Sequence, residues 1–221
     1  MAKKEKKILG IIPARGGSKG VPEKNIKLLN GYPLIWYTHQ AALESKMLSR
    51  TIVSTDDCDI KSICSKYGMD IPFKRPESLA KDDSPTFDVI EHSLQYMESV
   101  GENYGAVCLL QPTCPIREPG LIDKAISKFY NSNADSLISV KKVPHSYNPH
   151  WVFEENKDGF LKIVTDEIDI ISRRQSLPDA FIRDGAIYLT KTEVIKKQKS
   201  LYGKKVAYLL NSNEEIYNID T

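Results

Sequence analysis

The residues that follow the first apolar run of the chain have the types and the spacing of a phosphate-binding loop. The run Ile8 to Ile12 leads into Pro13 and the sequence ARGGSKG, with Lys24 and Asn25 a few positions on. Glycines let backbone N–H groups approach an anion closely, and arginine and lysine add charges suited to phosphate oxygens. The loop matches neither G-x-x-x-x-G-K-[ST] nor G-x-G-x-x-G. It predicts a triphosphate cradle; the alternative is a glycine-rich basic surface loop. The candidate contacts are Ala14, Arg15, Gly16, Lys19, Lys24 and Asn25.

A second polar candidate stands directly after an expected central strand. The run Gly105 to Leu110 reads GAVCLL, and Gln111 follows it. Ligands of open α/β sheets bind in the crevice outside the carboxyl ends of the strands, so an amide at this edge is expected to face a binding site. The alternative is a glutamine that pairs with the backbone of its own loop.

The elements that must position these residues alternate between short apolar runs and longer amphipathic ones, which is typical of β-α-β units around a parallel sheet. We therefore expect an α/β fold with one Rossmann-like domain, a mostly parallel sheet flanked by helices. The expected strands are Ile8 to Pro13, Thr51 to Thr55, Gly105 to Leu110, Ser136 to Val140, Ala186 to Thr190 and Val206 to Leu210. The expected helices are Leu34 to Lys46, Asp57 to Tyr67, Pro85 to Met97 with Ser84 as its N-cap, and Pro119 to Tyr130.

The alternation breaks in residues 141–181, which carry three prolines, several aromatic residues and two charged clusters without a clear period. A stretch of this length is rarely structureless inside a compact domain unless it is functional. We expect an inserted arm here, between two parts of one core, residues 1–140 and 182–221.

The composition predicts one folded domain without a specialised surface. The chain has 221 residues, of which 41% are hydrophobic and 27% charged, and its net charge is +2. This balance gives no sign of a nucleic-acid-binding surface, and no stretch approaches the roughly 20 apolar residues of a membrane helix. The four cysteines have no C-x-x-C spacing, and free thiols are typical of a reducing, cytoplasmic environment. We expect neither nucleic acid nor membrane as a partner.

The motifs of this chain are similar to those of one known family. The opening run IIPARGGSKGVPEKNIKLLNGYPLIWYT resembles, almost residue for residue, the opening of the acylneuraminate cytidylyltransferases, or CMP-sialic acid synthetases. Further matching motifs follow in the same order: VSTDD from Val53, RPESLAKDDSPT from Arg75, LLQPTCPIR from Leu109, RRQSLPDAFIRDGAIYL from Arg173 and NIDT from Asn218. The resemblance implies a nucleotidyltransferase that joins CMP from CTP to a nine-carbon, sialic-acid-like nonulosonic acid and releases pyrophosphate.

The resemblance also implies roles in CTP binding. In this reaction the protein mainly positions groups and neutralises charge. Arg15 and Lys24 match the residues that hold the triphosphate, and they are catalytic candidates for that reason. Lys19 would assist them, and Asn25 would contact either a phosphate or the ribose.

Three more residues match positions around the nucleotide and the sugar. Arg75 resembles the family residue near the base, and Thr86 lies at the matching Ser/Thr turn. Their alternatives are an exposed arginine before a proline and a helix-capping hydroxyl. Gln111 resembles the glutamine that contacts the sugar.

The metal site is where the sequence departs from the family pattern. Many relatives carry D-x-D in the last strand, and here the first position is Asn218 and the second Asp220. Mg²⁺, or Mn²⁺ in its place, prefers carboxylate oxygens, and an amide carbonyl can substitute at lower charge. Asp220 is therefore the main expected ligand and a third catalytic candidate. Asn218 is a second ligand or a partner of one, and the two residues share a strand face.

The arm is the segment that the resemblance assigns to dimerisation and sugar binding. In the family this region swaps across the interface of a homodimer, and a basic residue from it helps to hold the sugar carboxylate. Arg173, Arg174 and Gln175 match that region, and an arginine fork suits a carboxylate. The alternative is a pair of solvated cations. Phe181 lies where the family lines the acyl-sugar pocket.

Two alternatives to this function stay open. One is a nucleotidyltransferase for another ulosonic acid or another nucleotide. The other is a non-catalytic sugar-nucleotide-binding homologue, which only the Asn218 departure favours.

Overall fold

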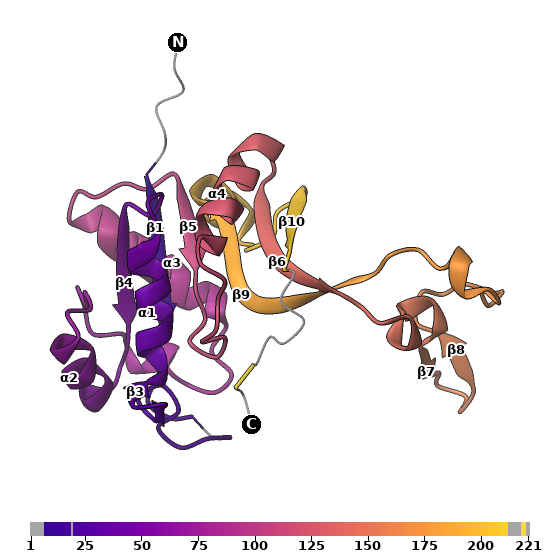
Figure 1. Cartoon of the computed structure of the whole chain (residues 1–221), viewed down its shortest axis with the longest axis horizontal. Helices are drawn as coiled ribbons and strands as arrows, with labels where there is room; N and C mark the ends of the chain where they lie inside the picture. Colours follow the sequence, from indigo (N-terminus) through magenta and orange to yellow (C-terminus); the bar gives the residue numbers. More distant parts are fainter. Residues whose placement is uncertain (1–6, 19, 212–217, 220–221) are drawn as a thin grey trace, which may run out of the picture.

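A computed structural model describes residues 7–18, 20–211 and 218–219, and its centre is a six-stranded sheet in the order β10-β6-β9-β5-β1-β4 (Figure 1). The strands are β1 (Ile8–Pro13), β4 (Arg50–Ser54), β5 (Ala106–Leu109), β6 (Ser136–Lys142), β9 (Phe181–Lys191) and β10 (Val206–Leu210). The pairs β1–β4, β1–β5 and β6–β10 are parallel, and β9 runs antiparallel between β5 and β6. The expected mostly parallel α/β sheet is confirmed, with one reversed strand.

Helices cover both faces of this sheet, because its strands are apolar on both sides. Ile8 and Ile12 of β1 belong to one core cluster, and Leu9 and Ile11, which point the other way, belong to a second. The first cluster contains residues of α1 (Leu34–Glu44), α2 (Cys58–Lys66) and α4 (Leu121–Ser132). The second contains residues of α3 (Thr86–Ser99) and α5 (Thr192–Gln198). No helix in residues 7–18, 20–211 and 218–219 is long and apolar enough to cross a membrane.

Helices α2 and α3 begin in different ways. Asp57 caps α2, where its Oδ1 accepts from the N–H groups of Asp59 and Ile60 at 2.8 and 2.9 Å. The expected cap at Ser84 is wrong. Pro85 is extended, with ψ 137°, so helix α3 begins at Thr86 and has Pro85 at its N-cap without a side-chain hydrogen bond. The Ser84 hydroxyl donates to the Ser78 carbonyl at 3.1 Å.

Three short elements lie beside the sheet. Strands β2 (Leu28–Leu29) and β3 (Tyr32–Pro33) form a small antiparallel hairpin before α1. The 3-10 helix η1 (Glu77–Leu79) precedes the loop that leads into α3.

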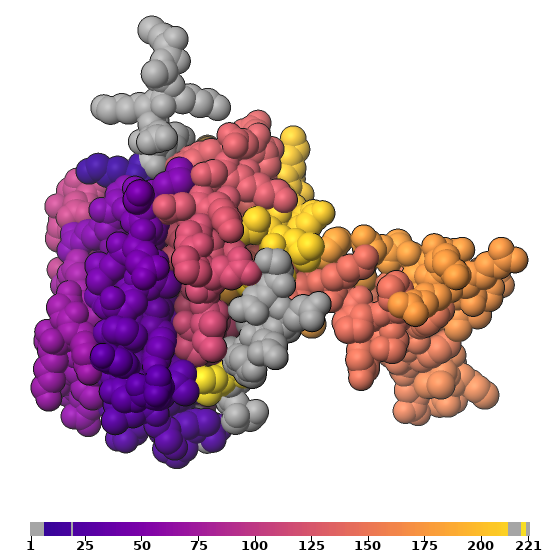
Figure 2. All heavy atoms as spheres, in the orientation of Figure 1, coloured from indigo at the N-terminus to yellow at the C-terminus, as the bar shows by residue number. Residues whose placement is uncertain are grey.

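The segment between β6 and β9 leaves the sheet as an arm, which forms a separate lobe in the space-filling view (Figure 2). It is rooted where the β6–β9 ladder ends, at Lys142 opposite Phe181. Its apolar side chains are unusually exposed, with Ile168 at 98% and Leu161 at 71%. The arm contains η2 (His145–Tyr147), η3 (Pro149–Trp151), η4 (Arg174–Ser176) and the antiparallel hairpin β7 (Phe153–Glu155) and β8 (Leu161–Ile163).

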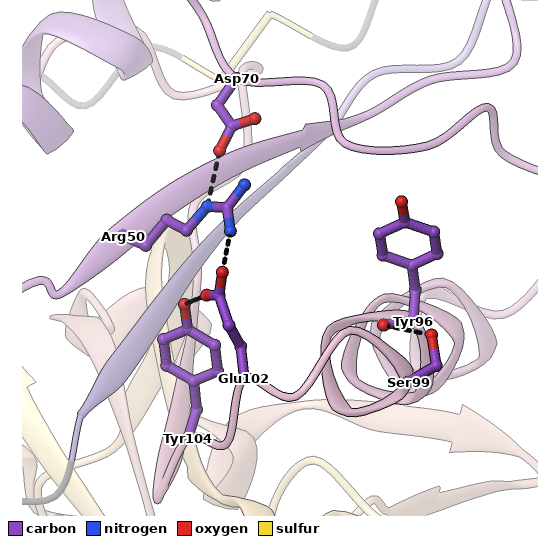
Figure 3. Close-up of polar contacts among 6 residues, drawn as sticks. All are labelled: Arg50, Asp70, Tyr96, Ser99, Glu102 and Tyr104. Carbon is purple, nitrogen blue, oxygen red and sulfur yellow. Dashed lines mark hydrogen bonds and ion pairs between the residues drawn. The ribbon is translucent and has the colours of Figure 1, made fainter.

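A network of polar side chains ties the start of β4 to neighbouring loops (Figure 3). Arg50 Nε donates to Asp70 at 2.7 Å, and Arg50 Nη1 donates to Glu102 at 2.5 Å. Glu102 also accepts the hydroxyl of Tyr104 at 2.5 Å. Burial, followed by this carboxylate, raises the pKa of Tyr104 to about 12, so the phenol remains a donor at neutral pH. The network lies at the amino end of β4, away from the carboxyl edge where the candidate site is found.

Candidate nucleotide-binding site

The loop after β1 packs closely against the loop after β4, and this contact sets its shape. Ala14 is fully buried, and its N–H donates to the Ser54 carbonyl at 2.9 Å. The N–H of Gly16 donates to Asp56 Oδ1 at 3.3 Å, and a Cβ at Gly16 would lie 2.3 Å from Asp57 Oδ2. Glycine is therefore needed at position 16 for close packing, and its N–H group faces a carboxylate in this arrangement. Ala14 likewise contributes to the support of the loop.

A cleft of about 550 Å³ opens beside this loop. Its other walls come from the loop that follows η1 and from the loop that follows β5, so it lies at the carboxyl edge of the sheet, where ligands of open α/β sheets bind. The structure brings together in its lining six residues that the sequence singled out: Arg15, Lys24, Asn25, Arg75, Thr86 and Gln111. Lys19 lies outside the described residues.

Asn25 and Arg75 are the buried polar residues of this lining. The Asn25 amide donates to the Arg15 carbonyl at 3.0 Å, so it holds the phosphate loop in shape. Arg75 is 3% exposed, and its Nε donates to Ser54 Oγ at 3.0 Å. Burial lowers the pKa of Arg75 to about 10, with Asp56 opposing this effect and Arg15 adding to it. Arg75 therefore remains a fixed positive charge at neutral pH, in contrast to the exposed arginine that was its alternative.

Arg15 pairs across the cleft with a residue that the sequence analysis did not single out. Its Nη1 lies 2.7 Å from Asp82 Oδ1, and both side chains are partly exposed. Asp82 also lines the cleft. It stands in the RPESLAKDDSPT motif, whose sequence alone does not show that Asp82 would meet Arg15.

Gln111 lies on the loop after β5, close to the backbone of β9. Gly185 has φ +83°, and a Cβ there would lie 3.0 Å from both Gln111 Oε1 and Cys114 Sγ. Only glycine combines this φ with such close neighbours. The loop is held by Arg117, the last residue of LLQPTCPIR, which the sequence analysis did not single out; its guanidinium donates to the Gln111 and Cys114 carbonyls.

The residues predicted in the arm do not line the cleft of their own chain. Arg173, Arg174 and Gln175 are exposed in and beside η4, on the lobe that projects from the core (Figure 1). Phe181 lies at the root of the arm, where its ring stacks on Tyr208 of β10 at 4.8 Å between centroids. In a single chain these four residues and the cleft are therefore separate.

Of the two described residues near the end of the chain, Asn218 and Ile219, the second contacts the cleft lining through its backbone. The Ile219 N–H donates to the carbonyl of Thr113, a residue of the cleft lining, at 2.8 Å. This places exposed Asn218, next to Ile219, near the cleft. Asp220 lies outside the described residues. Within the described ranges, no three His, Cys, Asp or Glu side chains gather as a metal site.

The cysteines offer no nucleophile for covalent chemistry in the core. All four are thiols rather than disulfides, and Cys64, Cys108 and Cys114 are buried. Burial raises the pKa of Cys64 and of Cys108 to about 12, so both stay protonated thiols at neutral pH. No cysteine is among the described residues that line the cleft.

Comparison with known proteins decides the family. A family model described as Cytidylyltransferase matches residues 9–217. The chain belongs to this cytidylyltransferase family. The chain is 34% identical over 218 residues to CMP-N,N'-diacetyllegionaminic acid synthase of Legionella pneumophila, and the matched region covers 97% of this chain and 91% of that relative. It is 32% identical over 211 residues to N-acylneuraminate cytidylyltransferase of Escherichia coli, covering 95% of this chain and 48% of that protein.

A third relative and a solved structure agree with these two. Pseudaminic acid cytidylyltransferase of Campylobacter jejuni is 29% identical to this chain over 215 residues, and the match covers 97% of this chain and 91% of the relative. The structure of CMP:2-keto-3-deoxy-manno-octonic acid synthetase in complex with CTP superposes with a TM-score of 0.71 at 15% identity, covering 97% and 93% of the two chains. That likeness confirms the nucleotidyltransferase fold, and the sequence relatives confirm the resemblance to the acylneuraminate cytidylyltransferases.

Proposed function

We propose that this enzyme transfers CMP from CTP to the anomeric hydroxyl of a sialic-acid-like nonulosonic acid. The observation that carries the proposal is the cleft itself, which places the cations of Arg15, Lys24 and Arg75 in one lining with the amide of Gln111. A tetra-anionic triphosphate needs several cations around it, and a polyhydroxy acid needs hydrogen-bonding groups beside it. The relatives named above act on legionaminic, pseudaminic and acylneuraminic acids.

In the proposed reaction the anomeric oxygen bonds to the α-phosphorus of CTP. The bond from that phosphorus to the α,β-bridging oxygen breaks, its electron pair leaves with pyrophosphate, and the hydroxyl proton passes to water. Arg15 and Lys24 hold the triphosphate and offset the charge that develops on the leaving group. Asn25 keeps the Arg15 loop in shape, and Gln111 orients the sugar. Arg75 supplies fixed positive charge at the buried wall of the cleft.

The direct test is a substrate panel with purified protein. We expect CMP-sugar and pyrophosphate in equal amounts from CTP and at least one of N-acetylneuraminate, legionaminate and pseudaminate. An eight-carbon ulosonic acid and the nucleotides GTP and UTP serve as comparison substrates, and turnover of these alone would select the alternative transferase. Absence of turnover with every acid, despite CTP binding, would favour the non-catalytic homologue.

Mg²⁺ or Mn²⁺ is the cofactor we propose, with Asp220 as ligand and Asn218 as second ligand or its partner. The contact between Ile219 and Thr113 supports this assignment, because it brings Asn218 and Ile219, the described residues beside Asp220 in the sequence, to the cleft in which the phosphates would lie. A bound divalent ion would neutralise phosphate charge during the transfer. Among the chain's own groups, carboxylate and amide oxygens are the donors that suit such an ion.

Replacing Asn218 with aspartate should lower the magnesium concentration for half-maximal activity by roughly three- to tenfold, because a carboxylate binds Mg²⁺ more strongly than an amide. Titration of the initial rate with Mg²⁺ measures this. Asn131→Asp, the same change on the exposed surface of α4, is the control. An equal magnesium requirement in wild type and Asn218→Asp would place residue 218 away from the ion.

We also propose a cytoplasmic homodimer in which the arm of one chain completes the cleft of the other. The exposed apolar side chains of the arm support this, because monomeric proteins seldom expose such a surface. The same arrangement would bring Arg173, Arg174 and Gln175 to a sugar carboxylate that they do not reach in their own chain. The free, buried thiols suit a reducing compartment.

The Asp82 carboxylate forms an ion pair with the Arg15 guanidinium, and we expect it to compete there with the phosphates of CTP. Replacing Asp82 with asparagine should tighten CTP binding about two- to fivefold, since a partly exposed ion pair contributes up to about 1 kcal/mol. Calorimetric titration with CTP measures this effect. Asp83→Asn removes the same charge from the next, exposed residue and should change the Kd less. Weaker binding in Asp82→Asn would instead assign Asp82 to the bound nucleotide or its metal ion.

A further inference from the structure

All five N–H donors of the Arg117 guanidinium are used in the structure. Nε donates to the Ala186 carbonyl at 3.2 Å, and Nη2 donates to the same carbonyl at 3.0 Å and to that of Gln111 at 2.8 Å. Nη1 donates to the Cys114 carbonyl at 2.5 Å and to Thr38 Oγ1 at 2.9 Å. One side chain therefore joins the loop after β5, strand β9 and helix α1.

The loop that Arg117 holds carries two separate contacts of the candidate site. Gln111, at its start, lines the cleft with its side chain. Thr113 also lines the cleft, and its carbonyl accepts the N–H of Ile219, which anchors the described terminal segment. Both carbonyls that Arg117 binds in this loop, those of Gln111 and Cys114, flank Thr113. A shift of the loop would therefore move the Gln111 amide and the docking point of Ile219 together.

The arrangement is specific for a guanidinium. A lysine ammonium has three donors on one nitrogen, whereas the four acceptors here lie around a planar fork. Burial lowers the pKa of Arg117 to about 10, with Cys114, Cys108 and Asp184 opposing this effect, so the group stays charged at neutral pH. The phosphate loop is held by different contacts, those of Asn25 and Ser54.

We propose that Arg117 is a positioning residue that fixes the loop of residues 111–114, and so aligns the Gln111 amide with the docked terminal segment. The inference rests on the proposed function, in which Gln111 orients the sugar. It assigns no contact between Arg117 and either substrate. Loss of Arg117 should therefore impair sugar binding and not CTP binding, because it should misplace the sugar and leave the triphosphate contacts of Arg15 in place.

Replacing Arg117 with lysine should raise the KM for the sugar about tenfold and lower kcat about tenfold, while the Kd for CTP stays within twofold. In amide hydrogen exchange by NMR, Cys114 and Ile219 should exchange at least fivefold faster than in wild type, because their N–H groups donate to Gln111 and to Thr113. Thr38→Val removes one acceptor of Arg117 with little change of shape, and with it the long hydrogen bond of 3.5 Å from the Thr38 hydroxyl to the Gln111 carbonyl. Thr38→Val should raise the sugar KM and both exchange rates by about two- to threefold. This variant serves as the test if the lysine variant does not fold.

The matched control is Arg50→Lys. Arg50 is also a partly buried arginine with several hydrogen bonds, but it lies at the amino end of β4 (Figure 3). The Arg50→Lys variant should have a lower melting temperature than wild type, with the same KM for the sugar and the same amide exchange rates at Cys114 and Ile219. If both lysine variants lower all kinetic parameters alike, or if exchange at Cys114 and Ile219 is unchanged in Arg117→Lys, the positioning role is wrong. A wild-type enzyme that turns over no sugar overturns the proposed function, and the exchange rates still decide whether Arg117 holds the loop.

Discussion

Replacing Arg15 with alanine is expected to lower kcat/KM for CTP by about 10²-fold. Arg15 lies in the cleft beside Lys24, and its guanidinium is already engaged with an anionic oxygen, that of Asp82. A charge-assisted hydrogen bond contributes about 1.5 to 3 kcal/mol, and a forked arginine makes two such bonds to a phosphate. Each 1.4 kcal/mol is a factor of ten, so the loss of one to two bonds gives this estimate. Initial rates of pyrophosphate release at varied CTP measure it.

Lys27→Ala is the matched control for this prediction. Lys27 follows the same loop, is exposed and is not part of the cleft lining. Its replacement removes one positive charge close to the loop and should change kcat/KM less than threefold. If Lys27→Ala costs as much as Arg15→Ala, the effect is a general electrostatic one, and the specific phosphate contact of Arg15 is contradicted.

Replacing Gly185 with alanine should lower both stability and the use of the sugar. The φ of +83° should cost about 1 kcal/mol of the free energy of unfolding for any residue with a Cβ. The new methyl group would lie 3.0 Å from Gln111 Oε1 and from Cys114 Sγ, so the Gln111 side chain must move. We expect kcat/KM for the sugar to fall by about 10- to 100-fold. Denaturant unfolding and steady-state kinetics measure the two effects.

Gly101→Ala separates backbone strain from displacement of Gln111. Gly101 has the same φ of +83°, and a Cβ there would meet no atom within 4 Å. This variant should lose a similar free energy of unfolding and keep wild-type kinetics. An active Gly185→Ala enzyme with an unchanged sugar KM would show that Gln111 does not orient the sugar.

The sequence predicted those parts of the fold that depend on local patterns. Strands β1 and β10 have the expected bounds, since each is a short apolar run with clear ends. Strand β9 begins at Phe181, five residues before the expected start, because Phe181 and Ile182 pair with β6 beyond a bulge and need no buried face to do so. Helix α5 was not expected, since its seven residues are too few to show a helical period.

Residues of the candidate site could be predicted where several of them share one loop or directly follow one strand. Arg15 and Lys24 share a recognisable loop, and Gln111 follows a recognisable strand. Asp82 and Arg117 were not singled out, because their partners Arg15 and Ala186 are far away in the chain and meet them only after folding. The arm residues show the same limit, since a single chain does not bring them to its cleft.

A crystal structure of the protein with CTP would show whether the cleft beside the loop after β1 holds the nucleotide. We expect the nucleotide in this cleft, with phosphate oxygens on Arg15 and Lys24 in place of the Asp82 carboxylate, and with room left beside Gln111 for the sugar. CTP bound at another surface while this cleft remains empty, or a nucleotide whose phosphates point away from both cations, would contradict it.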